Sequence, residues 1–220
     1  MTGSRGRFIT FEGGEGAGKS TQVARLVARL KAHGIEAVAT REPGGSPRAE
    51  ALRAFILSGR AKPLGPVGEA VLFSAARADH VDVLIRPAIA RGAWVVCDRF
   101  SDSTRAYQGA AGAADPALIE ALQRVAIADM DPDMTILMDI APEIGLARAE
   151  QRRGADGADR FEGEGIAFHR ALRRAFLDIA GRARKRIVVV DASMEADALE
   201  AQIWSRVSER FAADLRKQAS

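Results

Sequence analysis

Residues 7–21 read Arg7-Phe8-Ile9-Thr10-Phe11-Glu12-Gly13-Gly14-Glu15-Gly16-Ala17-Gly18-Lys19-Ser20-Thr21, and this stretch decides the fold. It begins with a short β-type run and continues into glycines that match the phosphate-binding pattern G-x-x-x-x-G-K-[ST]. Apolar residues then recur at helical spacing, namely Val23, Leu26, Val27 and Leu30. Strand, glycine loop and helix in this order are the context that the pattern requires. We therefore prefer a phosphate-binding loop to the alternative, a glycine-rich turn with a chance Lys-Ser.

The chemistry of this loop predicts that the chain binds a nucleoside triphosphate. Glycines let successive backbone N–H groups point into one concavity, and the helix that follows adds its positive dipole end. Lys19 is placed to reach the terminal phosphates, and the Ser20 hydroxyl can bind Mg²⁺. The expected ATP-binding residues are Gly13, Gly14, Glu15, Gly16, Ala17, Gly18, Lys19, Ser20 and Thr21.

Composition narrows the class of protein. At 220 residues with 47% hydrophobic content, the chain is long enough for one large α/β domain, so we expect residues 1–220 to form a single domain. A net charge of +3 does not by itself indicate a nucleic-acid surface. The single cysteine, Cys97, lies in an apolar run and is expected to be a buried small hydrophobe. We see neither a membrane-spanning run nor a signal peptide, and we expect a cytoplasmic protein without a membrane partner.

Two strand-end loops are candidate ligand sites, because ligands of open α/β sheets bind at the carboxyl ends of the strands. The strand-like run at 36–40 leads into Arg41-Glu42-Pro43-Gly44-Gly45, for which a solvated turn is an equal alternative. The buried run at 94–97 ends in Asp98-Arg99, a common way for a phosphate-binding loop protein to present its metal-organising carboxylate. Asp139 and Asp191 also end strand-like runs, but helix starts follow them, so we expect strand-end or capping roles there.

The remaining segments are mostly helical. Over 67–89 the spacing places Glu69, Phe73 and Arg77 on one face, which suits a planar ligand such as a nucleobase. From spacing alone, a core phenylalanine and a surface ion pair are the simpler interpretation, and His80 is expected at the surface. In a helix that starts at Pro116, the expected buried residues are Leu118, Leu122 and Val125. The last helix is expected to present one unbroken apolar stripe, formed by Leu199, Ile203, Val207, Phe211 and Leu215.

A short lid is expected over about residues 148–164. Arg148 and Arg152 share a helix face, and Arg153 leads into a segment too rich in glycine and charge to pack, as far as Arg160. Arginines in such a mobile loop suit a cover over phosphates, although an ordinary solvated loop is the alternative.

Taken together, these segments resemble bacterial thymidylate kinases, over nearly the whole chain. Besides the phosphate-binding loop, five motifs occur in the family's order and approximate spacing: residues 40–45, residues 73–77, Asp98-Arg99, Ala106-Tyr107-Gln108-Gly109 and Asp159-Arg160-Phe161-Glu162. The resemblance implies a three-layer α/β/α fold of the phosphate-binding loop class, with a parallel sheet of about five strands and helices on both faces. It also implies transfer of the ATP γ-phosphoryl group to dTMP, Mg²⁺ as cofactor and a homodimer, with no nucleic-acid partner.

The resemblance assigns roles to residues that match the family's motifs. Lys19 and the loop hold ATP, and Ser20 and Asp98 hold Mg²⁺, Asp98 directly or through water. Arg99 holds the acceptor phosphate, Glu15 meets the 3′-hydroxyl of its sugar, and Phe73 stacks on thymine. The other expected acceptor residues are Arg77 at O4, Thr104 and Gln108 along base and sugar, Tyr107 against a ribose 2′-hydroxyl, and Arg41 and Arg53 near the acceptor.

The lid departs from the family pattern. It carries an inserted Gly/Ala/Asp stretch, so which of Arg152, Arg153 and Arg160 reaches the transferring phosphoryl group stays open. The phosphate-binding loop has an acidic residue where some relatives carry a basic one. That difference moves the catalytic arginine to the lid, with Arg152 and Arg153 as the candidates.

Four other functions share part of this pattern. Another nucleoside monophosphate kinase or a deoxynucleoside kinase would share the loop, the Asp-Arg strand end and the lid. A GTP-dependent switch would need an Asn-Lys-x-Asp motif, and the chain contains no asparagine. A nucleic-acid-stimulated ATPase would need a basic face with interleaved aromatic residues, which the spacing does not supply.

Overall fold

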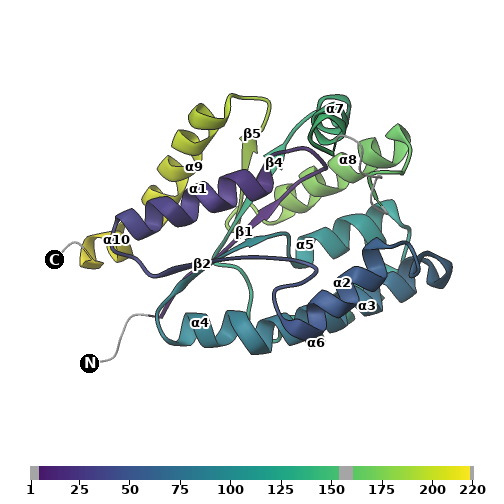
Figure 1. Ribbon diagram of the computed structural model, residues 1–220, viewed down its shortest axis with the longest axis horizontal. Helices are drawn as coiled ribbons and strands as arrows, with labels where there is room; N and C mark the ends of the chain where they lie inside the picture. Colours follow the sequence, from purple (N-terminus) through teal and green to yellow (C-terminus); the bar gives the residue numbers. More distant parts are fainter. Residues whose placement is uncertain (1–4, 154–160, 219–220) are drawn as a thin grey trace.

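The structure is a computed structural model that describes residues 5–153 and 161–218. Five parallel strands form one sheet in the order β2-β3-β1-β4-β5. In chain order they are β1 (Phe8–Glu12), β2 (Ala37–Arg41), β3 (Trp94–Asp98), β4 (Met134–Asp139) and β5 (Ile187–Asp191). Helices lie on both faces of the sheet (Figure 1). The expected α/β class, with a parallel sheet of about five strands, is confirmed.

The helices lie between the strands and after the last strand. The α-helices are α1 (Lys19–Ala32), α2 (Pro47–Leu57), α3 (Gly65–His80), α4 (Arg86–Ala90), α5 (Ser101–Thr104), α6 (Pro116–Ile127), α7 (Pro142–Arg153), α8 (Ile166–Arg182), α9 (Ala196–Arg210) and α10 (Ala212–Gln218). A 3₁₀ turn, η1, covers Lys62–Leu64, and two π-helical turns cover Val81–Ile85 (η2) and Arg105–Ala111 (η3).

The three central strands, β3, β1 and β4, are buried on both faces, as expected for parallel strands covered by helices. Successive side chains of a strand point to opposite faces, so β1 contributes to two cores. Ile9 and Phe11 pack with α1 and α9, whereas Phe8 packs with η2, α4 and the end of α6. A third cluster joins α8 and η3 over β4 and β5. The sheet is therefore the middle layer of three.

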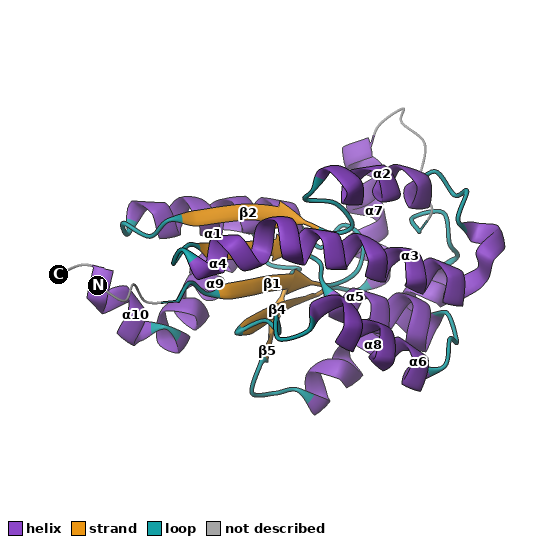
Figure 2. Cartoon of the chain, turned by 90° about the horizontal axis from the view of Figure 1, so that it is seen from below, coloured by secondary structure: helices purple, strands orange, loops and turns teal. Residues whose placement is uncertain are grey.

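The carboxyl ends of all five strands point toward one end of the molecule (Figure 2). In the pairing of β1 with β3, Phe11 lies opposite Asp98, so both strands end at the same level. The loop after β1 and the residues after β3 therefore emerge side by side.

Two expected helices are interrupted. The segment predicted as helical over 67–89 is divided into α3, η2 and α4. Pro87 has no N–H group to donate to the carbonyl one turn earlier, and the π-helical turn before it accommodates the missing bond. The last helix is not one continuous element, because it turns at Phe211, whose ring packs edge-on against Trp94 at 5.1 Å.

The prediction of the buried face of α6 was wrong in part. Val125 is 83% exposed, and Leu118 and Leu122 are only half-buried. The fully buried side of α6 carries Ile119, Ala126 and Ile127, together with the polar Gln123. Gln123 lies inside because it accepts a hydrogen bond from a buried arginine, so the buried side of α6 includes a polar residue that the apolar pattern did not predict.

Cys97 is fully buried in β3, as predicted, and burial raises the pKa of its thiol well above its ordinary value. Among the described helices, none combines the length and the apolar character needed to cross a lipid bilayer.

Candidate active site

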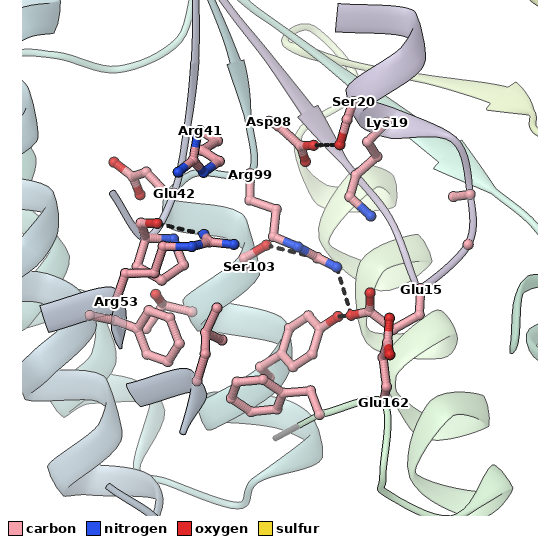
Figure 3. A pocket seen from close by; sticks show the side chains of 18 of the residues that line it. Glu15, Lys19, Ser20, Arg41, Glu42, Arg53, Asp98, Arg99, Ser103 and Glu162 are labelled. Carbon is pink, nitrogen blue, oxygen red and sulfur yellow. Dashed lines mark hydrogen bonds and ion pairs between the residues drawn. The ribbon is translucent and has the colours of Figure 1, made fainter. Parts of the chain in front are cut away.

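A cavity of about 320 Å³ opens at the carboxyl ends of the strands. Residues 15–21 of the phosphate-binding loop form one wall, and side chains from α2, α3, α5 and η3 form the other (Figure 3). The opposite wall includes Arg41, Glu42, Pro43, Arg53, Leu57, Phe73, Asp98, Arg99, Ser103, Thr104, Tyr107 and Gln108. The cavity is also lined by Arg152, which precedes residues 154–160 in the sequence, and by Phe161 and Glu162, which follow them. Most of the residues expected to form the site are thus brought together.

The loop has the backbone that its glycines predict. Gly13, Gly16 and Gly18 have positive φ angles, and a Cβ on Gly16 would overlap the carbonyl oxygen of Gly145 in α7. Lys19 is almost fully buried, and its ammonium group donates hydrogen bonds to the carbonyl oxygens of Gly13 (3.1 Å) and Gly14 (2.8 Å). Close packing against α7 leaves no alternative to glycine at position 16, so the curvature of the loop follows from its sequence.

Ser20 and Asp98 form the pair expected at a magnesium site. The Ser20 hydroxyl donates a 2.6 Å hydrogen bond to the Asp98 carboxylate, so the two side chains lie together beside the loop (Figure 3). Mg²⁺ prefers oxygen ligands and is usually bound by one or two carboxylates plus substrate phosphates and water. One hydroxyl and one carboxylate at the phosphate end of the cavity fit that requirement.

Glu15, Arg99 and Tyr107 form a hydrogen-bonded triad that joins the two walls. The Arg99 guanidinium donates to the Glu15 carboxylate at 2.7 Å and to the Gly13 carbonyl oxygen at 3.0 Å. The Tyr107 hydroxyl donates to the same Glu15 oxygen at 2.6 Å, and the Arg99 guanidinium lies over the Tyr107 ring at 5.1 Å. All three side chains line the cavity, so the acidic residue of the loop is directly linked to the arginine that follows β3.

The charges of this triad determine its protonation. Burial alone would raise the pKa of Glu15, but the positive charges of Arg99 and Lys19 lower it to about 2. The negative charges around Arg99 raise its pKa despite burial. Burial and the charge of Arg99 together lower the pKa of Lys19 to about 8. At neutral pH the site therefore holds an ionised carboxylate between two cations.

The far wall is built for a flat apolar group with polar edges. Phe73 lines the cavity, with its ring centroid 6.1 Å from that of Phe161, which in turn lies 5.1 Å from the ring of Tyr107. Thr104 and Gln108 line the same wall and are nearly fully buried. Aromatic faces with hydroxyl and amide groups at their edge suit a nucleobase.

Arg77 lies behind this wall and does not itself line the cavity. It is 1% exposed, and its Nε donates to Glu42 Oε2 at 2.6 Å. Its terminal nitrogens donate to Thr104 Oγ1 (3.1 Å), Gln123 Oε1 (2.5 Å) and the Phe100 carbonyl oxygen (3.0 Å). The alternative of a surface ion pair is therefore wrong, because the ion pair is in the interior. Contact of Arg77 with a bound base stays a prediction.

The expectation of a surface position for His80 was also wrong. His80 is fully buried, with Nδ1 3.0 Å from Glu42 Oε1 and Nε2 2.7 Å from Thr40 Oγ1. It satisfies the second oxygen of the carboxylate that binds Arg77. Glu42 and His80 are 38 residues apart in the sequence, and each is buried because it bonds to the other. The spacing of residues within one helix does not reveal such a contact.

Arg41 and Arg53 reach the cavity from β2 and α2. Arg41 is paired with Glu50 at 3.1 Å, and Arg53 donates to the Pro43 carbonyl oxygen at 2.7 Å. Both positions are compatible with the expected acceptor role, which remains a prediction.

The lid arginines differ in position. Arg148 donates to the carbonyl oxygens of Ala192 (2.8 Å) and Ser193 (3.2 Å), which ties the middle of α7 to the loop after β5. Arg152, one turn later, lines the cavity and lies 3.5 Å from Glu162. Arg153 is the last residue of α7, and Arg160 and the expected mobile segment lie outside the described residues.

Sequence reasoning missed several cavity residues. Glu42 and Pro43 belong to the strand-end loop that was singled out, but only its first arginine received a role. Glu162 ends the Asp159-Arg160-Phe161-Glu162 motif and also received none. Ser103 follows the Asp98-Arg99 motif and also lines the cavity, but nothing in its spacing marked it.

Replacement of Arg77 by alanine is expected to destabilise the fold strongly. Glu42 would keep His80 but lose its buried cation, and the carbonyl of Phe100 would lose a donor, so the expected loss is about 3–5 kcal/mol of unfolding free energy. Urea denaturation measures it. The matched control is Arg48→Ala, which removes a pair with Asp79 from a side chain that is 79% exposed and should cost less than about 1 kcal/mol. Equal losses in the two variants would contradict the structural role assigned to the buried pair.

Comparison with known proteins agrees with the geometry. The family model described as thymidylate kinase matches residues 11–203. A thymidylate kinase of Bradyrhizobium diazoefficiens is 54% identical over 207 residues, which cover 94% of this chain and 91% of the relative. One of Afipia carboxidovorans is 54% identical over 215 residues, covering 98% and 94%. The crystal structure of the thymidylate kinase from Ehrlichia chaffeensis superposes with a TM-score of 0.74 at 30% identity, covering 94% of this chain and 99% of that one. This chain belongs to the thymidylate kinase family.

Proposed function

We propose that the protein transfers the γ-phosphoryl group of ATP to dTMP, giving dTDP and ADP for the biosynthesis of dTTP. The observation that carries this proposal is that one cavity holds the phosphate-binding loop together with Phe73, Arg99 and Tyr107. Family membership supports the acceptor, because the similar proteins are named for that activity. The whole chain, residues 1–220, is proposed to act as one domain with a lid at about 148–164.

Phosphoryl transfer needs positioning and charge neutralisation more than covalent chemistry. The amides of residues 13–21 and Lys19 would hold the ATP phosphates, and Ser20 and Asp98 would hold Mg²⁺. Bound Mg²⁺ supplies charge neutralisation on the donor phosphates. Arg99 would bind the acceptor phosphate in bidentate fashion, since its planar guanidinium fits two phosphate oxygens.

The remaining acceptor contacts are proposed from the same wall. Phe73 would stack on thymine, while Thr104 and Gln108 would bond along its edge and the sugar. Glu15 would accept a hydrogen bond from the 3′-hydroxyl, for which its low pKa keeps it ionised. Tyr107, held by its bond to Glu15, would occupy the space of a ribose 2′-hydroxyl. Arg41, Arg53 and Arg77 would support the acceptor from further away.

We also propose that the protein is a homodimer that associates through α3 and α6. These helices lie side by side (Figure 1), and we assign to one apolar interface the exposed Val67 and Val71 of α3 and Val125 of α6, which are 45%, 47% and 83% exposed. Leu118 and Leu122 flank it on α6. The pattern of α6 places Leu118, Leu122 and Val125 on an apolar face, but the core of their own chain does not fully bury them. A second copy of the chain would cover them. Sedimentation equilibrium is expected to give twice the mass of the chain, and a monomer at micromolar concentration would contradict the proposal.

Because both proposed substrates are water-soluble nucleotides, a cytoplasmic location is proposed as well.

A steady-state assay with five acceptors tests the proposed activity. With ATP and Mg²⁺, dTMP is expected to give the highest kcat/KM, ahead of dUMP, AMP, GMP and thymidine, and EDTA should abolish the reaction. Lys19→Ala serves as the control for contaminating kinases, because loss of a preorganised charge at the phosphates should lower the rate about 10²–10³-fold. Preference for thymidine would indicate a deoxynucleoside kinase, and preference for AMP or GMP another monophosphate kinase.

The catalytic arginine is expected to be Arg152 rather than Arg153. Charge develops on the transferring phosphoryl group, and among the loop side chains Lys19 is the only cation, next to the acidic Glu15. Arg152 lines the cavity, whereas Arg153 sits about 100° further round the helix. Arg152→Ala should therefore lower kcat at least about tenfold with little change in either KM, and Arg153→Ala should lower it less.

The control for the arginine prediction is Arg174→Ala, which removes an exposed arginine of α8 and should leave kcat unchanged. If the double variant of Arg152 and Arg153 keeps most of its kcat, the catalytic arginine lies elsewhere and Arg160 becomes the first candidate. If both KM values rise while kcat stays constant, the lid arginines gather substrate but do not stabilise the transition state.

A further inference from the structure

Glu12, the last residue of β1, is a buried carboxyl group to which none of the roles above applies. Its side chain is 1% exposed. Its carboxylate accepts three hydrogen bonds, all from the segment that follows β3. The Phe100 N–H donates to Oε1 at 2.8 Å, the Ser103 N–H donates to the same oxygen at 3.1 Å, and the Ser103 hydroxyl donates to Oε2 at 2.6 Å. The two carboxylate oxygens of Glu12 therefore hold the backbone of the segment that follows β3.

The residue just before this segment is Arg99, whose backbone has an unusual conformation. Its φ angle is 67°, in the left-handed region that side chains other than glycine, asparagine and aspartate seldom adopt. Such a conformation persists only when the surrounding structure determines it, and it occurs often at functional sites. The Arg99 N–H donates to the Phe11 carbonyl oxygen at 2.8 Å, and the next N–H, of Phe100, donates to Glu12. Two consecutive residues of β1, Phe11 and Glu12, thus accept the hydrogen bonds of two consecutive N–H groups at this turn, those of Arg99 and Phe100.

The guanidinium of Arg99 is bound by the same segment of chain. It donates to the carbonyl oxygen of Gly13 and to the carboxylate of Glu15. Residues 11–15 therefore hold Arg99 at its own N–H group, at the following N–H group and at the end of its side chain. The loop that would bind the donor phosphates and the arginine that would bind the acceptor phosphate form one hydrogen-bonded unit.

Acceptor geometry, and not negative charge, is the property of Glu12 that this arrangement uses. Both backbone N–H groups donate to the same oxygen, Oε1, while burial and the charge of Asp102 raise the pKa of the Glu12 carboxyl group above its ordinary value. Oε1 accepts both backbone N–H groups whether or not the other oxygen carries a proton. An amide in place of the acid would keep Oε1 as an acceptor, and its NH₂ group could donate to the Ser103 hydroxyl.

We propose that Glu12 is a positioning residue for the acceptor site: by binding the backbone after Arg99, it holds Arg99 in the left-handed conformation from which the guanidinium faces the acceptor phosphate. The proposal rests on the function proposed above, because it takes that phosphate to be the one on dTMP. Glu12 itself touches no substrate and lies outside the lining of the cavity.

Kinetics of Glu12→Ala and Glu12→Gln test the proposal. In Glu12→Ala all three acceptors are lost, so the dTMP KM is expected to rise at least about tenfold while the ATP KM changes less than about threefold. In Glu12→Gln both constants should stay within about threefold of the unaltered protein. Calorimetric binding of dTMP and of ATP should show the same separation between the two nucleotides.

The matched control is Asp102→Ala. Asp102 is a buried carboxylate of α5, and it binds Arg105 and Arg186 but not the turn at Arg99. Its replacement is expected to lower stability and leave the ratio of the two KM values unchanged. If Glu12→Ala is not folded by circular dichroism, Glu12→Asp replaces it. That variant is too short to reach both N–H groups, and its dTMP KM should rise at least about threefold.

Three results would overturn the inference. The first is an equal rise of both KM values in Glu12→Ala, or no rise at all. The second is a Glu12→Gln variant as impaired as Glu12→Ala, which would mean that the charge is what matters. The third is a normal dTMP KM in Glu12→Asp. Failure of the proposed function is seen separately, because the unaltered protein would then phosphorylate no dTMP.

Discussion

The parallel pairing of β1 with β3 is the constraint on which the site depends. Its register sets Phe11 opposite Asp98, and the hydrogen bond from Arg99 to Phe11 extends the ladder by one residue beyond β3. Parallel strands in register end at the same edge of a sheet, so the glycine loop and the Asp98–Arg99 pair leave it together. A shift by one residue would turn Asp98 away from Ser20 and would place Phe8 and Ile9 on the wrong faces. Backbone pairing therefore brings Arg99 beside the glycine loop, where its guanidinium donates to Gly13 and Glu15.

The features that the sequence predicted well are those written in consecutive residues. The strand, loop and helix of residues 8–32 form a continuous pattern, as does the buried run that ends at Asp98. Such patterns report local backbone structure, and the chemistry of Lys19 and Ser20 follows from their place in it. The α/β class and the number of strands follow from the same alternation of runs. The order of the strands does not, because it depends on which faces pack against one another after the chain has folded.

The features that the sequence did not reveal depend on partners far along the chain. Gln123 and His80 are buried because they bond to Arg77 and Glu42, which are 46 and 38 residues away. A polar residue gives no sign in the sequence that such a partner exists, so the pattern placed His80 at the surface and Val125 in the interior. Glu12 lies directly before the phosphate-binding pattern, yet its burial and its bonds to Phe100 and Ser103 became evident only when β3 lay beside β1.

Cys97 has a practical consequence for experiments on this protein. It is the single cysteine of the chain, it is enclosed in β3, and its thiol resists ionisation. Thiol-reactive dyes attack the exposed thiolate, so at neutral pH they should leave the native protein unlabelled. A cysteine introduced at a surface position would then be the one reactive site without removal of the native residue. A spectroscopic label could be attached to α7 or to α2 alone, and the change in its local environment followed while nucleotides bind.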